Sequence, residues 1–338
     1  MMERSILLIY TGGTIGMKTN PETGSLAPFD FGQIDTEVPE LRKFGVRIET
    51  ITFDPVIDSS NVSPTEWIRL AEVIRDHYEH HDGFVVLHGT DTMAYTASAL
   101  SFMMENLAKP IIFTGSQIPI GVLRTDGREN LISAIEIAAA GEVPEVCIYF
   151  QNSLLRANRT IKYNAEHFNA FRSPNYPPLA EAGITIKYNT PYIRKVDSFL
   201  PSLKVNTSLE TRVAVIRIFP GLQPEIFRAM LGIEALRGVV LETYGAGNAP
   251  TEPWFVEAVA ETVRRGVVVI NVTQCAAGSV DMALYDTGRA LLKAGVVSGR
   301  DMTTEAALAK LMYLLGEALP PSQLEHYLHT PIRGEITL

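Results

Sequence analysis

The hydrophobic positions of this 338-residue chain form short apolar runs, separated by longer stretches with helical spacing. The apolar runs predict strands at 6–10, 48–53, 84–87, 111–114, 146–150, 213–218, 239–243 and 267–272. The stretches between them predict helices at 64–80, 92–107, 127–140, 223–236, 252–265, 281–294 and 303–317. Several of the strands are apolar nearly throughout, as parallel strands covered on both faces are. The alternation therefore predicts βαβ units and an α/β fold.

This alternation lapses between residues 171 and 206, a stretch with little helical periodicity. Five prolines interrupt it: Pro174, Pro177, Pro178, Pro191 and Pro201. We expect a larger N-terminal domain at 1–185, with a mostly parallel sheet flanked by helices, and a linker at 186–206. A smaller C-terminal α/β domain, at 207–338, is expected to follow.

The first expected helix has a clear start signal. Ser63 stands at the N-cap position, Pro64 at the first helical position and Glu66 three residues after the cap. This is the pattern of a capping box, in which the serine and glutamate side chains each satisfy a backbone N–H of the other residue.

The charge balance limits the partners of the chain. It carries 29 Lys+Arg against 38 Asp+Glu, a formal net charge of −9. Nucleic acids and anionic membranes bind clustered Lys and Arg, so neither is an expected partner. The apolar run at 6–10 is too short for a secretory leader, and no apolar stretch nears the roughly 18 residues that span a bilayer. We therefore expect a cytoplasmic protein.

Cysteine and histidine give little sign of a disulfide or metal site. Cys147 and Cys275 are too few for a disulfide framework and lie in apolar, strand-like contexts, and Cys275 is expected to be a small buried hydrophobe. His77 and His81 are four residues apart, but no further ligand follows in a metal-binding pattern. A solvated helix end is expected there, and no metal.

The sequence TGGTIG at 11–16 directly follows the first expected strand. It lacks the Gly-Lys-Ser/Thr ending of a P-loop and the G-x-G-x-x-G spacing, which argues against nucleotide binding. Thr14 instead places a hydroxyl at the carboxyl end of a parallel strand, where open α/β sheets bind ligands. Adjacent glycines let a substrate approach the backbone and leave N–H groups for an oxyanion. A simple strand-exit turn is the plainer interpretation.

The sequence HGTDT at 88–92 follows the third expected strand and ends in hydroxyl, carboxylate and hydroxyl at a helix start. Capping of the helix by Asp91 or Thr92 would explain one of these polar residues but not all three. A carboxylate at a helix N-terminus is also well placed to orient a lysine or a substrate ammonium group.

Two further groups carry polar chemistry. Asp58, Ser59 and Ser60 follow the second strand and suit an α-carboxylate or a polar amide, although an ordinary loop also explains them. Lys162 follows the strand at 146–150 and is typical of a surface residue. It gains a catalytic meaning only if the fold returns it to Thr90 and Asp91, where it would activate a hydroxyl.

Together these motifs resemble the bacterial-type L-asparaginase family. The likeness is carried by TGGTI at 11–15 and HGTDTM at 88–93, in this order and at these strand ends. It continues through residues 58–60, 114–117, 158–162, 244–248 and 271–275, so it covers nearly the whole chain. The sequence AYTAS at 94–98 is similar to the cytoplasmic type I branch of the family.

The resemblance implies hydrolysis of L-asparagine, and more weakly of L-glutamine, at the side-chain amide, with no metal or organic cofactor. It implies Thr14 as the nucleophile that forms a β-aspartyl ester, and Thr90, Asp91 and Lys162 as a second set that assists attack by water. Substrate contacts are implied for Asp58, Ser59, Ser60, Gly89, Thr90, Asp91 and Ser116. Catalysis is thereby placed in the N-terminal domain, and a homodimer or homotetramer is implied.

One departure from the family pattern concerns the loop after the first threonine. Family members often carry a tyrosine there, but Met17 to Asp35 contains none, and Ser25 or Leu26 takes the matching position. The residue that relays the Thr14 proton is therefore left open.

A second departure concerns regulation. Type I enzymes with an effector site for asparagine carry an arginine before the Tyr-Gly segment and a threonine before the catalytic lysine. This chain has Glu242 and Ile161 at those positions, while Cys275 matches. Glu242 would repel the carboxylate of the effector and Ile161 cannot hydrogen-bond, so we expect the allosteric response to be absent or altered.

Two alternatives remain open. An ammonia-supplying amidotransferase subunit uses the same chemistry, but the related archaeal proteins carry an extra N-terminal domain, and a net charge of −9 does not favour a tRNA surface. A non-catalytic amino-acid sensor would need carboxylate and ammonium contacts but not the two threonine hydroxyls of Thr14 and Thr90.

Overall fold

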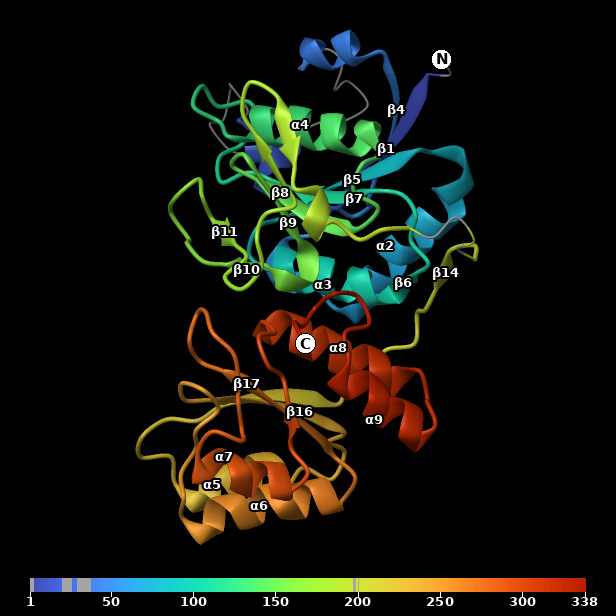
Figure 1. The fold of residues 1–338 in the computed structure, drawn as a ribbon. Coiled ribbons are helices and arrows are strands. Elements are labelled where there is room, and N and C mark those ends of the chain that lie inside the picture. Colours follow the sequence, from blue (N-terminus) through green and yellow to red (C-terminus); the bar gives the residue numbers. More distant parts are fainter. Residues whose placement is uncertain (1–2, 20–25, 29–37, 197–198, 200) are drawn as a thin grey trace. The chain divides into compact units, whose positions relative to one another are not determined.

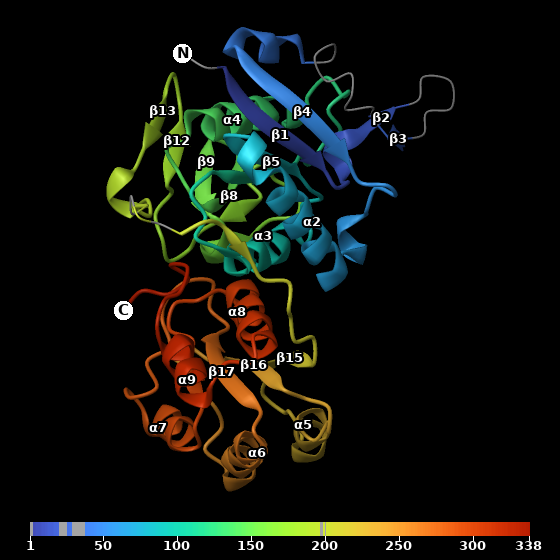
Figure 2. The same cartoon turned by 90° about the vertical axis from the view of Figure 1, so that its right-hand side faces the viewer.

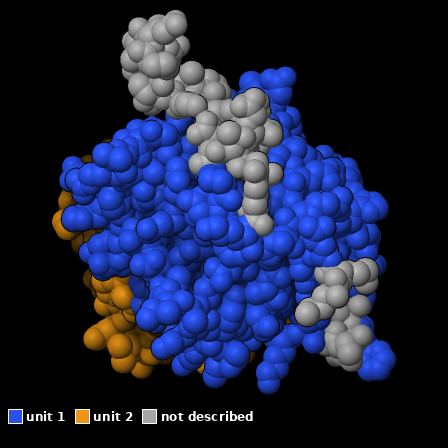
Figure 3. All heavy atoms as spheres, turned by 90° about the horizontal axis from the view of Figure 1, so that it is seen from above, with its two compact units in different colours: residues 1–207 blue, residues 208–338 orange. Residues whose placement is uncertain are grey.

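The structure is a computed structural model that describes residues 3–19, 26–28, 38–196, 199 and 201–338. The chain divides into two compact units, residues 1–207 and residues 208–338, which Figure 3 colours separately. Within the described ranges, no helix is both long enough and apolar enough to cross a membrane.

The first unit is built on an eight-stranded sheet in the order β13-β12-β9-β8-β7-β5-β1-β4 (Figure 1). The five strands β4, β1, β5, β7 and β8 run parallel, and β9, β12 and β13 extend the sheet in antiparallel fashion. The strands are β1 (Arg4–Tyr10), β4 (Val46–Thr52), β5 (Gly83–Leu87), β7 (Ile111–Thr114), β8 (Val146–Phe150), β9 (Ser153–Arg156), β12 (Ala180–Ala182) and β13 (Ile186–Tyr188).

Helices cover both faces of this sheet. Figures 1 and 2 show α4 (Gly127–Ala140) on one face and α2 (Pro64–His77) with α3 (Met93–Met103) on the other. Residues of β5 and β7 are fully buried between these layers, which explains why these strands are apolar at every position but the last of β7.

The first unit also contains shorter elements. These are η1 (Thr14–Gly16), β2 (Met17–Thr19), β3 (Leu26–Pro28), η3 (Pro39–Phe44), η4 (Ser59–Asn61), η5 (Tyr78–His80), β6 (Met104–Glu105), η6 (Ala157–Arg159), β10 (Ile161–Lys162), β11 (Phe171–Arg172), η7 (Thr190–Tyr192) and β14 (Lys204–Val205).

The order of the parallel strands positions a ligand site. The chain places β4 on one side of β1 and then β5 on the other, after which β7 and β8 follow outward. The connections that leave the carboxyl ends of β1 and β5 therefore diverge. In open α/β sheets, such a switch point leaves a crevice at the carboxyl ends of the strands, and this is where ligands bind.

The second unit contains a four-stranded parallel sheet in the order β15-β16-β17-β18. Its strands are β15 (Val213–Arg217), β16 (Gly238–Thr243), β17 (Val268–Thr273) and β18 (Val297–Ser298). Figure 2 shows α5 (Pro224–Leu231), α6 (Pro253–Arg264) and α7 (Asp286–Lys293) on one face of the sheet, and α8 (Thr304–Gly316) with α9 (Pro321–His329) on the other.

The α/β prediction is confirmed in both units, and all eight predicted strands are present within two residues of their expected ends. The helix expected at 92–107 ends at Met103, because the backbone turns extended at Met104 and β6 pairs with β14. The helix expected at 281–294 begins at Asp286, because Asp281 accepts the Ala283 N–H and closes a separate turn first. Helix α9 was not expected.

Residues of the expected linker pair with strands of the first unit. β13 pairs with β12, and β14 pairs with β6, which directly follows α3. The first compact unit accordingly includes residues up to Thr207.

The capping box at the start of α2 is confirmed. The Ser63 hydroxyl accepts the Thr65 N–H at 3.3 Å, and the Glu66 carboxylate accepts the Ser63 N–H at 2.7 Å and its hydroxyl at 2.6 Å. Partial burial alone would raise the pKa of Glu66, but the hydrogen bonds from Ser63 outweigh it and lower that pKa. The helix that connects β4 to β5 therefore begins at a fixed residue.

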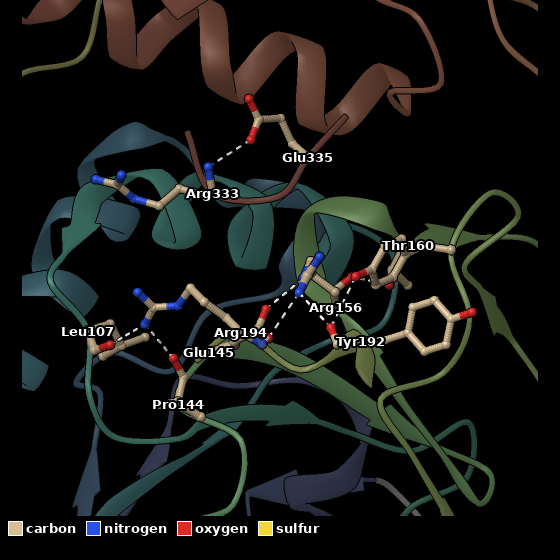
Figure 4. Close-up of polar contacts among 10 residues, drawn as sticks. Leu107, Pro144, Glu145, Arg156, Thr160, Tyr192, Arg194, Arg333 and Glu335 are labelled. Carbon is tan, nitrogen blue, oxygen red and sulfur yellow. Dashed lines mark hydrogen bonds and ion pairs between the residues drawn. The ribbon is translucent and has the colours of Figure 1, made fainter. Parts of the chain in front are cut away.

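A buried ion pair anchors the chain just before β10. Figure 4 shows Arg156, at the end of β9, directed toward Glu145; its Nε donates to that carboxylate at 2.6 Å. The Arg194 N–H donates to the same carboxylate at 2.6 Å, and the Arg194 guanidinium donates to the carbonyls of Pro144 and Leu107. Because β9 leads through η6 into β10, this network fixes the starting point of the segment that carries Lys162.

Candidate active site

Two glycines shape the turn that follows β1. Gly12 and Gly13 have φ angles of 144° and 93°, a region that residues with side chains rarely adopt. A Cβ on Gly12 would lie 2.0 Å from the carbonyl oxygen of Ile57, and one on Gly13 would lie 2.5 Å from the Gly89 Cα. The backbone after β1 is therefore packed directly against the segments that follow β4 and β5, and Thr14, partly exposed at the start of η1, lies at this junction.

Lys162 joins the polar residues that follow β5. Its Nζ donates to the Thr90 Oγ1 at 2.9 Å and to the Asp91 Oδ1 at 2.6 Å. The lysine comes from β10, 72 positions after Thr90, so only the fold brings these groups together. The Lys162 side chain is 18% exposed and the Asp91 side chain 66%, so the ion pair has one sheltered side and one side open to a ligand.

The polar residues at the start of α3 do not cap this helix. Thr92 is its N-cap residue, but its side chain makes no capping hydrogen bond and instead donates to the Ser59 carbonyl at 2.7 Å. Asp91 pairs with Lys162. The interpretation of these residues as simple helix caps is therefore wrong, and their side chains tie the segments after β4, β5 and β9 together.

Ser59 lies against the Gly89 backbone, because a Cβ on Gly89 would be 2.5 Å from the Ser59 Oγ. Ser59 is 4% exposed, whereas its neighbours Asp58 and Ser60 are exposed. Asp58 caps η4 by accepting the Ser60 N–H at 3.0 Å, and the hydrogen bonds from Ser60, that of the backbone N–H first, lower the pKa of Asp58. The three residues thus present a carboxylate and hydroxyls next to the turn after β5.

Ser116 follows β7 and is only 2% exposed. Its hydroxyl has no hydrogen-bond partner among the described residues. Its Cβ would lie 3.1 Å from a Cβ placed on Gly127, so Ser116 packs against the start of α4. Because buried hydroxyls are nearly always hydrogen-bonded, an unsatisfied one at the carboxyl edge of the sheet indicates a place for a ligand or a bound water.

His88 lies beneath the turn after β5. Its Nδ1 is 2.7 Å from the Gly89 carbonyl oxygen, and since a carbonyl only accepts, the hydrogen bond assigns the proton to Nδ1. The side chain is buried, and this burial lowers the pKa of His88 to about 4 although the hydrogen bond to Gly89 opposes the shift. His88 is therefore a neutral support of the turn.

This burial predicts an acid-sensitive stability. The unfolded chain takes up the His88 proton below its ordinary pKa of 6.5, whereas the folded protein takes it up only near pH 4. The unfolded state therefore binds more protons between these values, and the free energy of unfolding falls as the pH is lowered through this window. From pH 7 to pH 5 the loss from this group is about 2 kcal/mol.

Urea unfolding at pH 7 and pH 5 measures this loss, with His88→Asn as the comparison because asparagine retains an N–H donor near Gly89 but does not titrate. The fall between the two pH values should be smaller in the variant, whatever its absolute stability. An equal fall in both proteins would assign the acid sensitivity to other groups.

The sequence matches two family models. One is "Asparaginase, N-terminal", over residues 5–194, and the other is "Glutaminase/Asparaginase C-terminal domain", over residues 212–328. The chain belongs to the asparaginase family.

Curated relatives and a solved structure agree with this membership. The chain is 44% identical over 343 residues to L-asparaginase 1 of Escherichia coli K12, a match that covers 100% of this chain and 99% of that protein. It is 43% identical over 357 residues to the 60 kDa lysophospholipase of Homo sapiens, covering 99% of this chain and 62% of that protein. The crystal structure of L-asparaginase I from Vibrio cholerae superimposes with a TM-score of 0.90 at 43% identity, covering 99% and 100% of the two chains.

Within this member of the asparaginase family, the residues singled out from the sequence come from the ends of β1, β4, β5 and β7 and from β10. Direct contacts join Thr90, Asp91 and Lys162. The turn that holds Thr14 and the side chain of Ser59 both pack against Gly89. Ser116 lies just beyond the end of β7. Of the positions that match the lid tyrosine, Ser25 lies outside the described residues and Leu26 begins β3.

Two further residues near the site were assigned no role from the sequence. The Tyr10 hydroxyl, at the end of β1, donates to the Gly13 carbonyl at 3.3 Å, and its ring fills the space beside Gly16. Burial raises the pKa of Tyr10 to about 12, so this phenol stays protonated. The second residue is Gln117, whose side-chain amide oxygen accepts a hydrogen bond from the Thr90 hydroxyl at 3.2 Å. The sequence feature that could have identified Gln117 is its position next to Ser116, just beyond a predicted parallel strand.

Two expectations about other residues are wrong. His81 is 3% exposed rather than solvated, because η5 turns it inward, where Nδ1 lies 3.1 Å from the His77 carbonyl and Nε2 lies 3.2 Å from Glu49. Cys147 is buried, but Cys275 is exposed, because it lies two residues beyond the end of β17. Among the residues that the structure describes, no cluster of three or more His, Cys, Asp or Glu could hold a metal ion.

Proposed function

We propose that this protein hydrolyses L-asparagine to L-aspartate and ammonia through an ester on Thr14. The observation that carries the proposal is the pair of contacts from Lys162 to Thr90 and Asp91, beside the glycine junction that holds Thr14. Membership of the asparaginase family and 44% identity to a full-length L-asparaginase support the same reaction.

In the first half of the proposed reaction, the Thr14 Oγ attacks the amide carbon of the asparagine side chain. A C–O bond forms, the C–N bond breaks, and the hydroxyl proton leaves with the nitrogen as ammonia. The transient oxyanion would lie against backbone N–H groups of the turns after β1 and β5, which the contact between Gly13 and Gly89 holds together.

In the second half, water attacks the ester carbon. The Thr90 Oγ, which receives an N–H from Lys162, would accept a hydrogen bond from this water and aim it. A new C–O bond forms, the bond to the Thr14 oxygen breaks, and the proton lost by water ends on that oxygen. The positive charge of Lys162 offsets the negative charge that develops during this step.

Substrate recognition follows from the charges around the site. Asp91 uses Oδ1 for Lys162, and Oδ2 would receive the substrate ammonium group. Ser59, Ser60 and the backbone beside Asp58 and Gly89 would hold the α-carboxylate. The buried Ser116 hydroxyl would bond the amide end of the substrate.

Release of ammonia from L-asparagine and L-glutamine by the purified protein tests this function. We expect turnover of asparagine and slower turnover of glutamine. Tight binding of asparagine without ammonia release would instead identify a sensor, and release that depends on a charged tRNA acceptor would identify an amidotransferase subunit. We further propose a cytoplasmic homodimer or homotetramer that needs no metal or organic cofactor.

We also propose that asparagine does not activate this protein allosterically. The Glu242 carboxylate at the end of β16 accepts the Thr304 hydroxyl at 2.6 Å and lies 3.6 Å from Arg217, with 13% of its side chain exposed. A second carboxylate, Glu305, lies near it, and burial raises the pKa of Glu305. The Glu242 carboxylate is thus already engaged by Thr304 and Arg217, and it offers no positive charge to the carboxylate of an effector.

The double variant Glu242→Arg with Ile161→Thr is expected to turn hyperbolic asparagine kinetics into sigmoidal kinetics. The two substitutions restore the residue types that the resemblance implies at these positions for type I enzymes with an effector site, an arginine for the carboxylate and a threonine for a hydrogen bond. Initial rates against asparagine concentration give the Hill coefficient, which should exceed 1 in the double variant alone. Glu181→Arg, at an exposed position of β12, controls for the change in charge, and hyperbolic curves in every protein would contradict the idea.

A further inference from the structure

Gln117 connects three segments of the site through its side-chain amide. Its Oε1 lies 3.2 Å from the Thr90 Oγ1, and its Nε2 donates to the carbonyls of Ala165 and His167, each at 3.2 Å. Both carbonyls belong to the connection between β10 and β11, the hairpin whose first strand contains Lys162. One side chain thus contacts the turn after β5 and the segment that carries the lysine.

These partners assign the orientation of the amide. A carbonyl oxygen only accepts, so the NH₂ group of Gln117 must face Ala165 and His167 and the amide oxygen must face Thr90. The Thr90 hydroxyl therefore donates its hydrogen to Gln117. Lys162 donates to the same Thr90 oxygen at 2.9 Å and occupies one of its two lone pairs.

Among the described residues, the second lone pair of the Thr90 oxygen is the only part of this hydroxyl without an assigned partner. With the hydrogen fixed by Gln117 and one lone pair fixed by Lys162, the tetrahedral oxygen has a single remaining direction in which to accept. Water that attacks an ester must be held by an acceptor of this kind. The orientation of Thr90 as an acceptor thus depends on Gln117.

The backbone of Gln117 is itself fixed. Its N–H donates to both oxygens of Asp126 at 3.1 Å, and the Ile118 N–H donates to Asp126 at 3.2 Å. Asn130 donates to the Gly115 carbonyl at 3.0 Å and to Asp126 at 3.3 Å, so the first turn of α4 holds the segment after β7 from both sides. Because its backbone is fixed in this way, Gln117 holds the Thr90 hydroxyl in one orientation.

We propose that Gln117 is a positioning residue for the second half of the reaction, in which it orients the Thr90 hydroxyl so that Thr90 accepts a hydrogen bond from the attacking water. This inference rests on the proposed function. It assigns no bond change to Gln117, and it gives Gln117 a role in ester hydrolysis but not in the attack by Thr14.

The test separates the two half-reactions, because ammonia leaves in the first and aspartate in the second. In Gln117→Met, which keeps the length of the side chain but loses both polar ends, we expect kcat to fall about 10- to 100-fold. Since kcat/KM depends only on steps up to ammonia release, it should stay within about threefold of wild type. Rapid mixing should then show a burst of ammonia equal to the enzyme concentration, ahead of slow turnover.

Gln117→Glu gives a second readout. A protonated glutamate keeps one donor, its O–H, for Ala165 or His167 and a carbonyl oxygen for Thr90, although it has one hydrogen fewer than the amide, whereas an ionised one cannot donate to either carbonyl. The kcat of this variant relative to wild type should therefore rise as the pH is lowered from 8 to 5. Gln323→Met, an exposed position on α9, is the matched control and should behave as wild type.

Equal losses in kcat and kcat/KM without a burst, or a Gln117→Met variant with wild-type kcat, would overturn the positioning role. If Gln117→Met fails to fold, a flat pH dependence of the Gln117→Glu ratio would overturn it as well. A wild-type protein that releases no ammonia from asparagine would refute the proposed function itself, which distinguishes the two failures.

Discussion

Thr14→Ala is expected to abolish asparagine hydrolysis, with a fall in kcat on the order of 10⁴-fold or more, because the variant has no atom to carry the acyl group. Substrate affinity should change little, since the proposed ammonium and carboxylate contacts come from Asp91 and from residues 58–60. Steady-state ammonia release measures the loss, and isothermal titration of asparagine into the inactive variant measures binding.

Thr14→Ser keeps a hydroxyl and should retain a substantial part of the activity. Thr65→Ala, at an exposed position of α2, removes a threonine elsewhere and should have no effect on kcat. Ammonia release by Thr14→Ala at a rate near that of wild type would remove Thr14 from the role of nucleophile and point to another hydroxyl, of which Thr90 is the nearest candidate.

Lys162→Met is expected to lower kcat on the order of 10³-fold, because it removes a charged donor aimed at the reacting groups. The Thr90 oxygen would lose its bond at 2.9 Å and Asp91 its bond at 2.6 Å, so Thr90 would keep only its hydrogen bond to Gln117 and Asp91 would lose the contact that orients its carboxylate. Methionine retains most of the length of the side chain, which limits the loss of packing in β10. Steady-state kinetics on asparagine measures the effect.

Lys187→Met, on exposed β13, is the matched control, since it changes the same charge at the far edge of the sheet. It should leave kcat and KM unchanged. A wild-type rate in Lys162→Met would mean that the contacts of this lysine are structural, in which case a lower melting temperature should accompany the substitution.

Much of the candidate site could be predicted from the sequence because its residues directly follow apolar strands. Thr14 and Thr90 each stand after a glycine turn at the end of a buried strand, and parallel strands bring their carboxyl ends to one edge. The capping box at Ser63 was equally local, since both of its partners lie within four residues. Local patterns of this kind can be recognised because the residues that form them are close together in the sequence.

The remainder depended on tertiary structure. No feature of the neighbouring sequence distinguishes Lys162 from a surface lysine. Its candidate role rests on the β10–β11 hairpin, which brings its side chain to Thr90. The role proposed for Gln117 depends on its hydrogen bonds to two carbonyl groups about 50 positions away. His81 was misjudged because the carboxylate that meets it, Glu49, lies on a strand 32 positions earlier.

The separation between Thr90 and Lys162 also has a consequence for the order of folding. During synthesis, β1 and β5, which Thr14 and Thr90 follow, leave the ribosome well before the β10–β11 hairpin, which closes a contact over 72 positions. Contacts of such long range form slowly, because the entropy of closing the loop is lost before any contact repays it. A nascent chain can therefore hold the five parallel strands of the sheet and still lack a complete site, so that catalytic competence comes only after this part of the sheet has formed.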